Sequence, residues 1–124
     1  MPLPDDVDLR TCLAACDDLE KKVLGGLVAR CIVEPQRVRD GEWLLRTFVE
    51  VATVALAAGD TGPATTADVE RVQTWVRSHR DHVLRTALRL FLRTADELRA
   101  AGSPPTLESA QAIVRRHLAG SGAP

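Results

Sequence analysis

Apolar residues recur at helical spacing along most of the chain. Residues 9–31, 69–101 and 107–119 each carry an apolar stripe with a period close to that of an α-helix. Residues 40–58 differ, because they are apolar almost throughout and Glu50 is their only charge from position 47 onward. A helix that is apolar around most of its circumference is expected at the centre of a domain. The pattern therefore predicts an all-α fold with the 40–58 helix as its buried core.

Residues with strong turn and capping preferences predict where these helices begin and end. Asp40 precedes the apolar run and is a good N-cap, and Thr106 stands in the same position before the last stripe. Pro35 ends the first stripe, since the residue before a proline disfavours helix. Turn-forming residues at 59–63 end the apolar run, and Gly120 ends the last helix.

Two positions inside the stripes predict irregularities. Gly25-Gly26 either kinks its helix or allows another backbone to approach closely. The 69–101 stripe would make a single helix of roughly 50 Å, which is long for a domain of this size. Ser78 followed by Asp81 resembles a capping pair, so a break or bend is expected near residues 79–81.

Length and composition set the class of protein. The 124 residues suit one helical domain of five to six helices, with residues 1–4 as a leader and 120–124 as a flexible tail. The net charge of −1 gives no support for nucleic-acid binding. Three cysteines are an odd number and lie on a helical pattern, which favours a reducing compartment over a disulfide scaffold. No signal peptide or C-terminal membrane anchor is expected.

The start of the apolar run resembles a known motif. Arg39-Asp40-Gly41, with a tryptophan and then Arg46, resembles the first homology region of the Bcl-2 family of apoptosis regulators, Arg-Asp-Gly-x-Asn-Trp-Gly-Arg. Arg46 stands at the family's arginine position without a gap. Trp43 is one residue early, and Leu45 replaces the family's glycine. Residues 71–76 are similar to the family's following helix, and residues 12–19 look like its third homology region.

The resemblance implies a Bcl-2-like helical bundle around a central hydrophobic helix and a binding function without enzymatic activity. Such a protein, here a compact viral homologue, inhibits apoptosis by holding the amphipathic death-motif helix of pro-apoptotic proteins in a surface groove. The expected location is the host-cell cytosol, in some cases associated with mitochondria. Arg46 would pair with the ligand's aspartate, because a guanidinium can hold a carboxylate with two hydrogen bonds. The residues expected at this groove are Arg46, Asp40, Leu45, Phe48 and Val49.

Structural alternatives exist for these residues. Arg46 could instead pair internally with Asp40 or Glu50, and Phe48 and Val49 suit the core as well as a groove. Leu45 should narrow the approach that glycine leaves open in the family. Trp43 and Trp75 are expected in the core.

Two other functions fit the sequence. The first is an unrelated helical interaction or dimerisation module, and a homodimer is compatible with either binding function. The second is a metal site, since Cys12 and Cys16 share one helix face, and His79 and His82 could complete a tetrahedral zinc set. Buried packing is the favoured role for these cysteines, so neither metal nor cofactor is expected. The sequence contains no Gly-rich phosphate loop, no paired-carboxylate motif and no nucleophile signature, so it gives no indication of an enzyme.

Overall fold

The computed structural model describes residues 4–57 and 66–121, and all regular structure in these residues is helical. The helices are α1 (Pro4–Ala14), α2 (Asp18–Val33), α3 (Gly41–Leu56), α4 (Thr66–Ala101) and α5 (Leu107–Ser121), with a 3₁₀ turn η1 (Pro35–Arg37) after α2. The predicted all-α bundle is therefore confirmed. The turn predicted at 59–63 lies outside the described residues.

Local sequence explains most of the helix ends. The Asp40 carboxylate accepts the backbone N–H groups of Glu42 (3.1 Å) and Trp43 (3.3 Å), as predicted for an N-cap. The Thr106 hydroxyl caps α5 by accepting the N–H of Ser109 at 3.1 Å. Gly102, at φ +67°, ends α4 in the left-handed conformation that glycine adopts without steric cost. Helix α5 continues to Ser121, slightly past the glycine predicted to end it.

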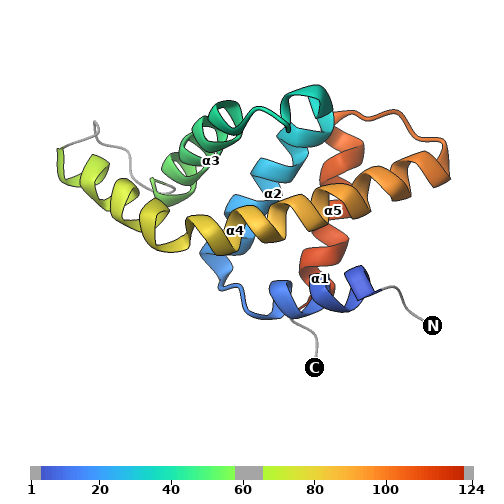
Figure 1. Cartoon of the computed structure of the whole chain (residues 1–124), viewed down its shortest axis with the longest axis horizontal. Coiled ribbons are helices and arrows are strands. Elements are labelled where there is room, and N and C mark those ends of the chain that lie inside the picture. The colour runs from blue at the N-terminus through green and yellow to red at the C-terminus, as the bar shows by residue number, and fades with distance from the viewer. Residues whose placement is uncertain (1–3, 58–65, 122–124) are drawn as a thin grey trace.

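Helix α2 lies at the centre of the bundle. It packs against α3, α4 and α5, and Figure 1 shows these helices arranged around it. Its buried side chains form the largest part of the core: Glu20, Val23, Leu24, Leu27, Val28, Ala29, Cys31 and Ile32. The prediction that the 40–58 helix occupies the centre is wrong. One face of α3 is open to solvent, and Val54 on it is 73% exposed.

The glycine pair explains how α3 comes so close to α2. A Cβ atom at Gly26 would lie 2.8 Å from Cγ1 of Val51, so close that the Val51 side chain or the helices would have to shift. Gly26 therefore allows the close approach that the sequence offered as one of two alternatives. The pair does not end the helix, because α2 runs without interruption from Asp18 to Val33.

Two helix boundaries differ from those predicted. Helix α4 continues through residues 79–81, so of the two predicted alternatives the break does not occur; the helix spans the long axis of the molecule (Figure 1). No break is needed there because the N-terminal part of α4 packs against α3: Val72 and Val76 are buried, and the Arg71 guanidinium donates to the Leu56 carbonyl at 3.1 Å. The 9–31 stripe is in turn divided into two helices. α1 ends at Ala14, and Asp17 caps α2 by accepting the N–H of Glu20 at 2.8 Å.

Candidate functional sites

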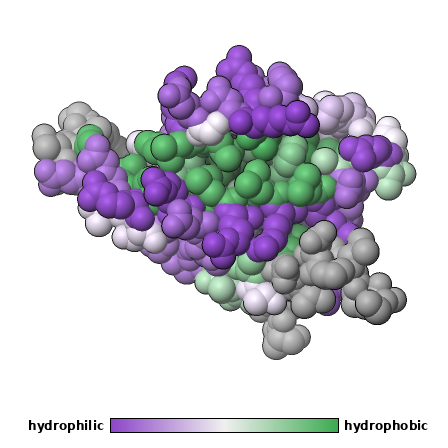
Figure 2. Space-filling view, viewed as in Figure 1, coloured by the Kyte–Doolittle hydropathy of each residue, from purple (hydrophilic) through white to green (hydrophobic). Residues whose placement is uncertain are grey.

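A broad apolar area covers one face of the molecule. Figure 2 shows it on the side where α4 crosses the bundle, bounded above and below by hydrophilic residues. Leu88 and Leu92 on α4 are 38% and 61% exposed. Phe91 and Ala95, both partly buried, lie at helical spacing with these leucines and so share their face of α4. This set, together with the partly buried Leu84 one turn earlier, is called the α4 apolar stripe below.

A shallow groove of about 270 Å³ lies at the C-terminal end of the α4 apolar stripe. Phe91 and Ala95 form one wall, and the guanidinium-bearing Arg99 is part of the lining. The remaining lining residues come from the end of α2, η1, the end of α4 and the turn before α5: Ile32, Pro35, Leu98, Ser103 and Pro105. The groove is therefore apolar with one cationic residue.

A second groove of about 450 Å³ runs between α2, α3 and α5. Val54 and Leu107, 73% and 50% exposed, contribute its most accessible apolar surface. Arg30 and Glu50 are among its lining residues and form an ion pair at 3.0 Å. A salt bridge between α2 and α3 is thus part of the groove lining.

The residues expected to contact a ligand helix lie in different environments. Phe48 is fully buried in the core and stacks against Trp75 of α4, with ring centroids 5.9 Å apart. Val49 is partly buried, and Leu45 is 37% exposed. Asp40 caps α3 through its carboxylate. The structure therefore places Phe48 in the core, as Trp43 is, and leaves Leu45 the most accessible apolar residue of this set.

Arg46 is exposed on α3 and lines neither of the two grooves above. The two acids that could have neutralised it are engaged elsewhere, since Asp40 caps the helix and Glu50 pairs with Arg30. Among residues 9–57 and 69–119, whose side chains the structure describes, no salt bridge involves Arg46. Its guanidinium is thus accessible to a carboxylate from another molecule.

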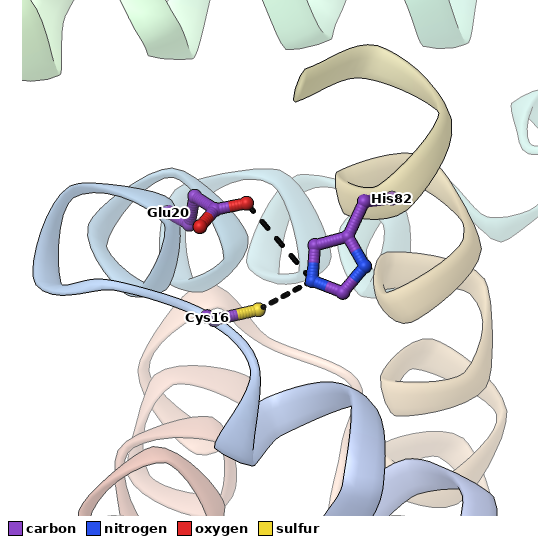
Figure 3. Close-up of side chains that lie close together, drawn as sticks. All are labelled: Cys16, Glu20 and His82. Atoms are coloured by element: carbon purple, nitrogen blue, oxygen red, sulfur yellow. Dashed lines mark hydrogen bonds and ion pairs between the residues drawn. The ribbon is translucent and has the colours of Figure 1, made fainter. Parts of the chain in front are cut away.

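A separate cluster forms where the α1–α2 turn meets α4. The Cys16 sulfur lies 3.3 Å from Nε2 of His82, and Oε2 of Glu20 lies 4.0 Å from the same nitrogen. Figure 3 shows the thiol and the carboxylate directed at this one ring atom. Oε2 of Glu20 also lies 3.3 Å from Nδ1 of His79. The structure therefore brings together Cys16 and His82, two members of the set that the sequence proposed for zinc.

Cys12 does not join this cluster. Its sulfur accepts a hydrogen bond from the Arg89 guanidinium at 3.2 Å. Glu20 takes part instead, a residue that sequence reasoning missed. Its signal was the Asp17-to-Glu20 spacing of a capping box, in which the glutamate Oε1 accepts the N–H of Asp17 at 3.0 Å.

Protonation limits what the cluster can do as a nucleophile. Burial, and then the charge of Glu20, raises the pKa of the Cys16 thiol to about 11. A thiol with this pKa is almost entirely protonated at neutral pH, whereas a nucleophilic cysteine needs a lowered pKa. The thiol also donates to the Cys12 carbonyl at 3.2 Å. The arrangement is thus unsuited to thiolate catalysis.

Comparison with known proteins finds no match for this chain among protein-family models, curated proteins or solved structures. None of the described helices combines the length and apolar character needed to cross a bilayer.

The segment resembling the third homology region, residues 12–19, is divided between two helices. Its first residues end α1 and its last ones begin α2, so it does not form one amphipathic surface. Asp17, which matches the aspartate of that region, is the N-cap of α2.

Proposed function

We propose that this protein is a helical interaction module that binds an amphipathic helix of a partner protein on the α4 apolar stripe. The observation that carries the proposal is the extent of apolar surface in Figure 2 on the side where α4 crosses the bundle. On α4, Leu88 and Leu92 are 38% and 61% exposed. Monomeric proteins seldom expose one large contiguous apolar area unless it is a binding surface. An amphipathic helix presents apolar residues every three or four positions, which matches the spacing of the stripe.

The charges on the exposed surface favour a ligand helix that carries acidic residues. Arg99 lines the groove at the end of the stripe, and Arg46 is exposed on α3 and forms no salt bridge with the side chains that the structure describes. In the form that the Bcl-2 resemblance implies, the ligand is the death-motif helix of a pro-apoptotic protein, and its aspartate pairs with Arg46. The protein would then suppress apoptosis in the cytosol of a host cell.

A peptide titration tests the proposal. A fluorescent peptide carrying the pro-death motif should bind saturably, as measured by fluorescence anisotropy. Leu92→Lys should weaken binding at least tenfold, because it places a charge in the apolar contact. Val69→Lys is the matched control: Val69 is also exposed on α4 (49%) but lies several turns before the stripe, so this change should leave the affinity unchanged. Arg46→Ala should weaken binding at least about 30-fold if it removes a charge pair worth 2 kcal/mol or more.

The outcomes separate the general proposal from its finer form. Loss of binding with Leu92→Lys but not with Arg46→Ala would support the interaction surface and reject the Bcl-2-like pairing. A concentration-dependent dimer in sedimentation that Leu92→Lys dissociates would assign the surface to a second copy of the chain. Absence of both peptide binding and dimerisation would overturn the proposal.

A further inference from the structure

The cluster of Cys16, Glu20 and His82 at the α1–α2 turn supports an inference that does not depend on the α4 apolar stripe. We propose that Cys16, Glu20 and His82 form a binding site for one divalent transition-metal ion of the zinc class, with a fourth coordination position open to solvent. The thiol sulfur, a carboxylate oxygen and the imidazole nitrogen all lie within 4.8 Å of one another.

The spacing of these atoms suits a single ion. Bonds of about 2.3 Å from zinc to sulfur and about 2.0 Å to nitrogen or oxygen place neighbouring tetrahedral donors about 3.5 Å apart. The sulfur-to-nitrogen distance of 3.3 Å and the oxygen-to-nitrogen distance of 4.0 Å bracket this value. The third pair, the sulfur and a carboxylate oxygen, lies within 4.8 Å, so binding one ion requires side-chain rotations that draw the three donors closer together.

The backbone holds two of the donors in place before any ion arrives. The N–H of Cys16 donates to the Leu13 carbonyl at 3.1 Å, which fixes the turn between α1 and α2. Glu20 is fixed by the capping box, since Oε1 accepts the Asp17 N–H and leaves Oε2 directed at α4. The donors thus come from a tight turn and a helix start, both anchored by hydrogen bonds.

The burial of Glu20 needs compensation, which a cation would supply. Its side chain is only 7% exposed, and a carboxylate is costly to bury without a partner of opposite charge or several hydrogen bonds. The ion-pair partners that the described residues offer to Oε2 are the two histidine nitrogens, at 3.3 Å and 4.0 Å. A metal ion between Glu20 and His82 would neutralise the carboxylate directly.

A neighbouring histidine would support the ligand carboxylate. Nδ1 of His79 lies 3.3 Å from Oε2 of Glu20, and the His79 ring stacks on Trp75 with centroids 4.5 Å apart. Groups that hydrogen-bond to metal ligands orient them and commonly change metal affinity 10–100-fold when removed. His79 is therefore assigned as a positioning residue outside the ligand set.

The donor types select the class of metal. A thiolate and an imidazole favour zinc and neighbouring transition metals, whereas calcium and magnesium prefer oxygen donors alone. Three protein donors with a free position are typical of sites that bind an exogenous ligand as well as the ion. The His82 side chain is 35% exposed, so water can reach the ion from the α4 side.

Titration of the untagged, metal-free full chain with Co²⁺ and with Zn²⁺ tests the site. We expect one ion per chain, a thiolate-to-cobalt charge-transfer band, and an increase in the melting temperature, because the ion binds only the folded state. Cys16→Ser, Glu20→Gln and His82→Gln should each abolish stoichiometric uptake. His79→Gln should weaken it roughly 10–100-fold.

Cys12→Ser is the matched control, since it removes a thiol four residues from Cys16 that is bonded to Arg89. It should leave uptake and the charge-transfer band unchanged. If Cys16→Ser fails to fold by circular dichroism, His82→Gln decides the matter, because His82 is the least buried ligand. Absence of stoichiometric binding, or binding that survives His82→Gln, would overturn the proposal.

Discussion

Hydroxyl side chains in this bundle have opposite effects at the start and in the middle of a helix. Thr106 precedes α5 and its hydroxyl accepts a backbone N–H that has no other partner in the helix. Ser78 lies inside α4, and its hydroxyl donates to the Thr74 carbonyl at 2.9 Å, four residues back. That carbonyl already has a helical partner, so the serine adds little to stability.

We therefore expect Ser78→Ala to leave stability unchanged or raise it by up to about 0.5 kcal/mol, since alanine has the higher helix propensity. Thr106→Ala should lower stability by about 1 kcal/mol through loss of the cap. Urea unfolding followed by circular dichroism measures both. A loss near 1 kcal/mol from Ser78→Ala would indicate that a helix begins at this residue, as the sequence alone suggested.

Single residues were predictable where their role is local. Asp40 and Thr106 were identified as caps because a cap depends on residues two or three positions away. Glu20 was not identified, since its importance comes from His79 and His82, which lie about 60 residues further along the chain and approach it only in the folded bundle. Metal-ligand sets of this kind cannot be completed from spacing within one helix.

At the scale of elements, the contact between α2 and α3 depends on the absence of one side chain. The two glycines of α2 face different neighbours: a Cβ at Gly26 would overlap Val51, whereas a Cβ at Gly25 would meet Leu118 of α5 at an ordinary 3.7 Å. The sequence showed the glycine pair but not which of the two was required. The difference arises only from the packing of α3 and α5 on α2.

Gly25→Ala and Gly26→Ala should consequently have opposite signs. Alanine in a helix is favoured over glycine by up to about 1 kcal/mol, so Gly25→Ala should stabilise the protein. Gly26→Ala should destabilise it, because overpacking costs about 1–3 kcal/mol and valine is stiff within a helix. The readout is the midpoint of thermal or urea unfolding, and Gly26→Ala with Val51→Ala should recover part of the loss. Equal stabilisation by both substitutions would show that α3 does not approach α2 at this point.

Helix continuity was harder to predict than helix type. The apolar spacing of residues 9–31 is uninterrupted, so the break between Ala14 and Asp18 is visible only through the capping box. In α4 the sequence gives the opposite error: Ser78 and Asp81 resemble a capping pair, yet the helix continues through them. The expected break assumed that so long a helix could not pack on a domain of this size, whereas α4 contacts α1, α2, α3 and α5, and Val72 and Val76 near its start are buried.

For the whole molecule, position in the bundle is decided by the number of packing partners and not by apolar content. Helix α3 is the more apolar segment, yet solvent covers one of its faces. Helix α2 contains lysines, glutamate and two glycines but is enclosed by α3, α4 and α5. The small residues Gly25, Gly26 and Ala29 let several neighbouring helices approach at once. The number of apolar residues in a helix does not reveal this effect.

This arrangement makes α2 the helix on which stability should depend most. Leu27 of α2 is fully buried, whereas Leu45 of α3 is 37% exposed. We expect Leu27→Ala to destabilise the protein by about 2–5 kcal/mol, because it removes buried contacts and leaves a cavity. The same change at Leu45 should cost under about 1 kcal/mol, since exposed positions contribute little. Urea unfolding measures both losses, and fitting the two variants with one common m-value allows their unfolding free energies to be compared directly. Equal losses would place α3 at the centre of the bundle, and a far smaller loss at Leu27 would contradict the enclosure of α2.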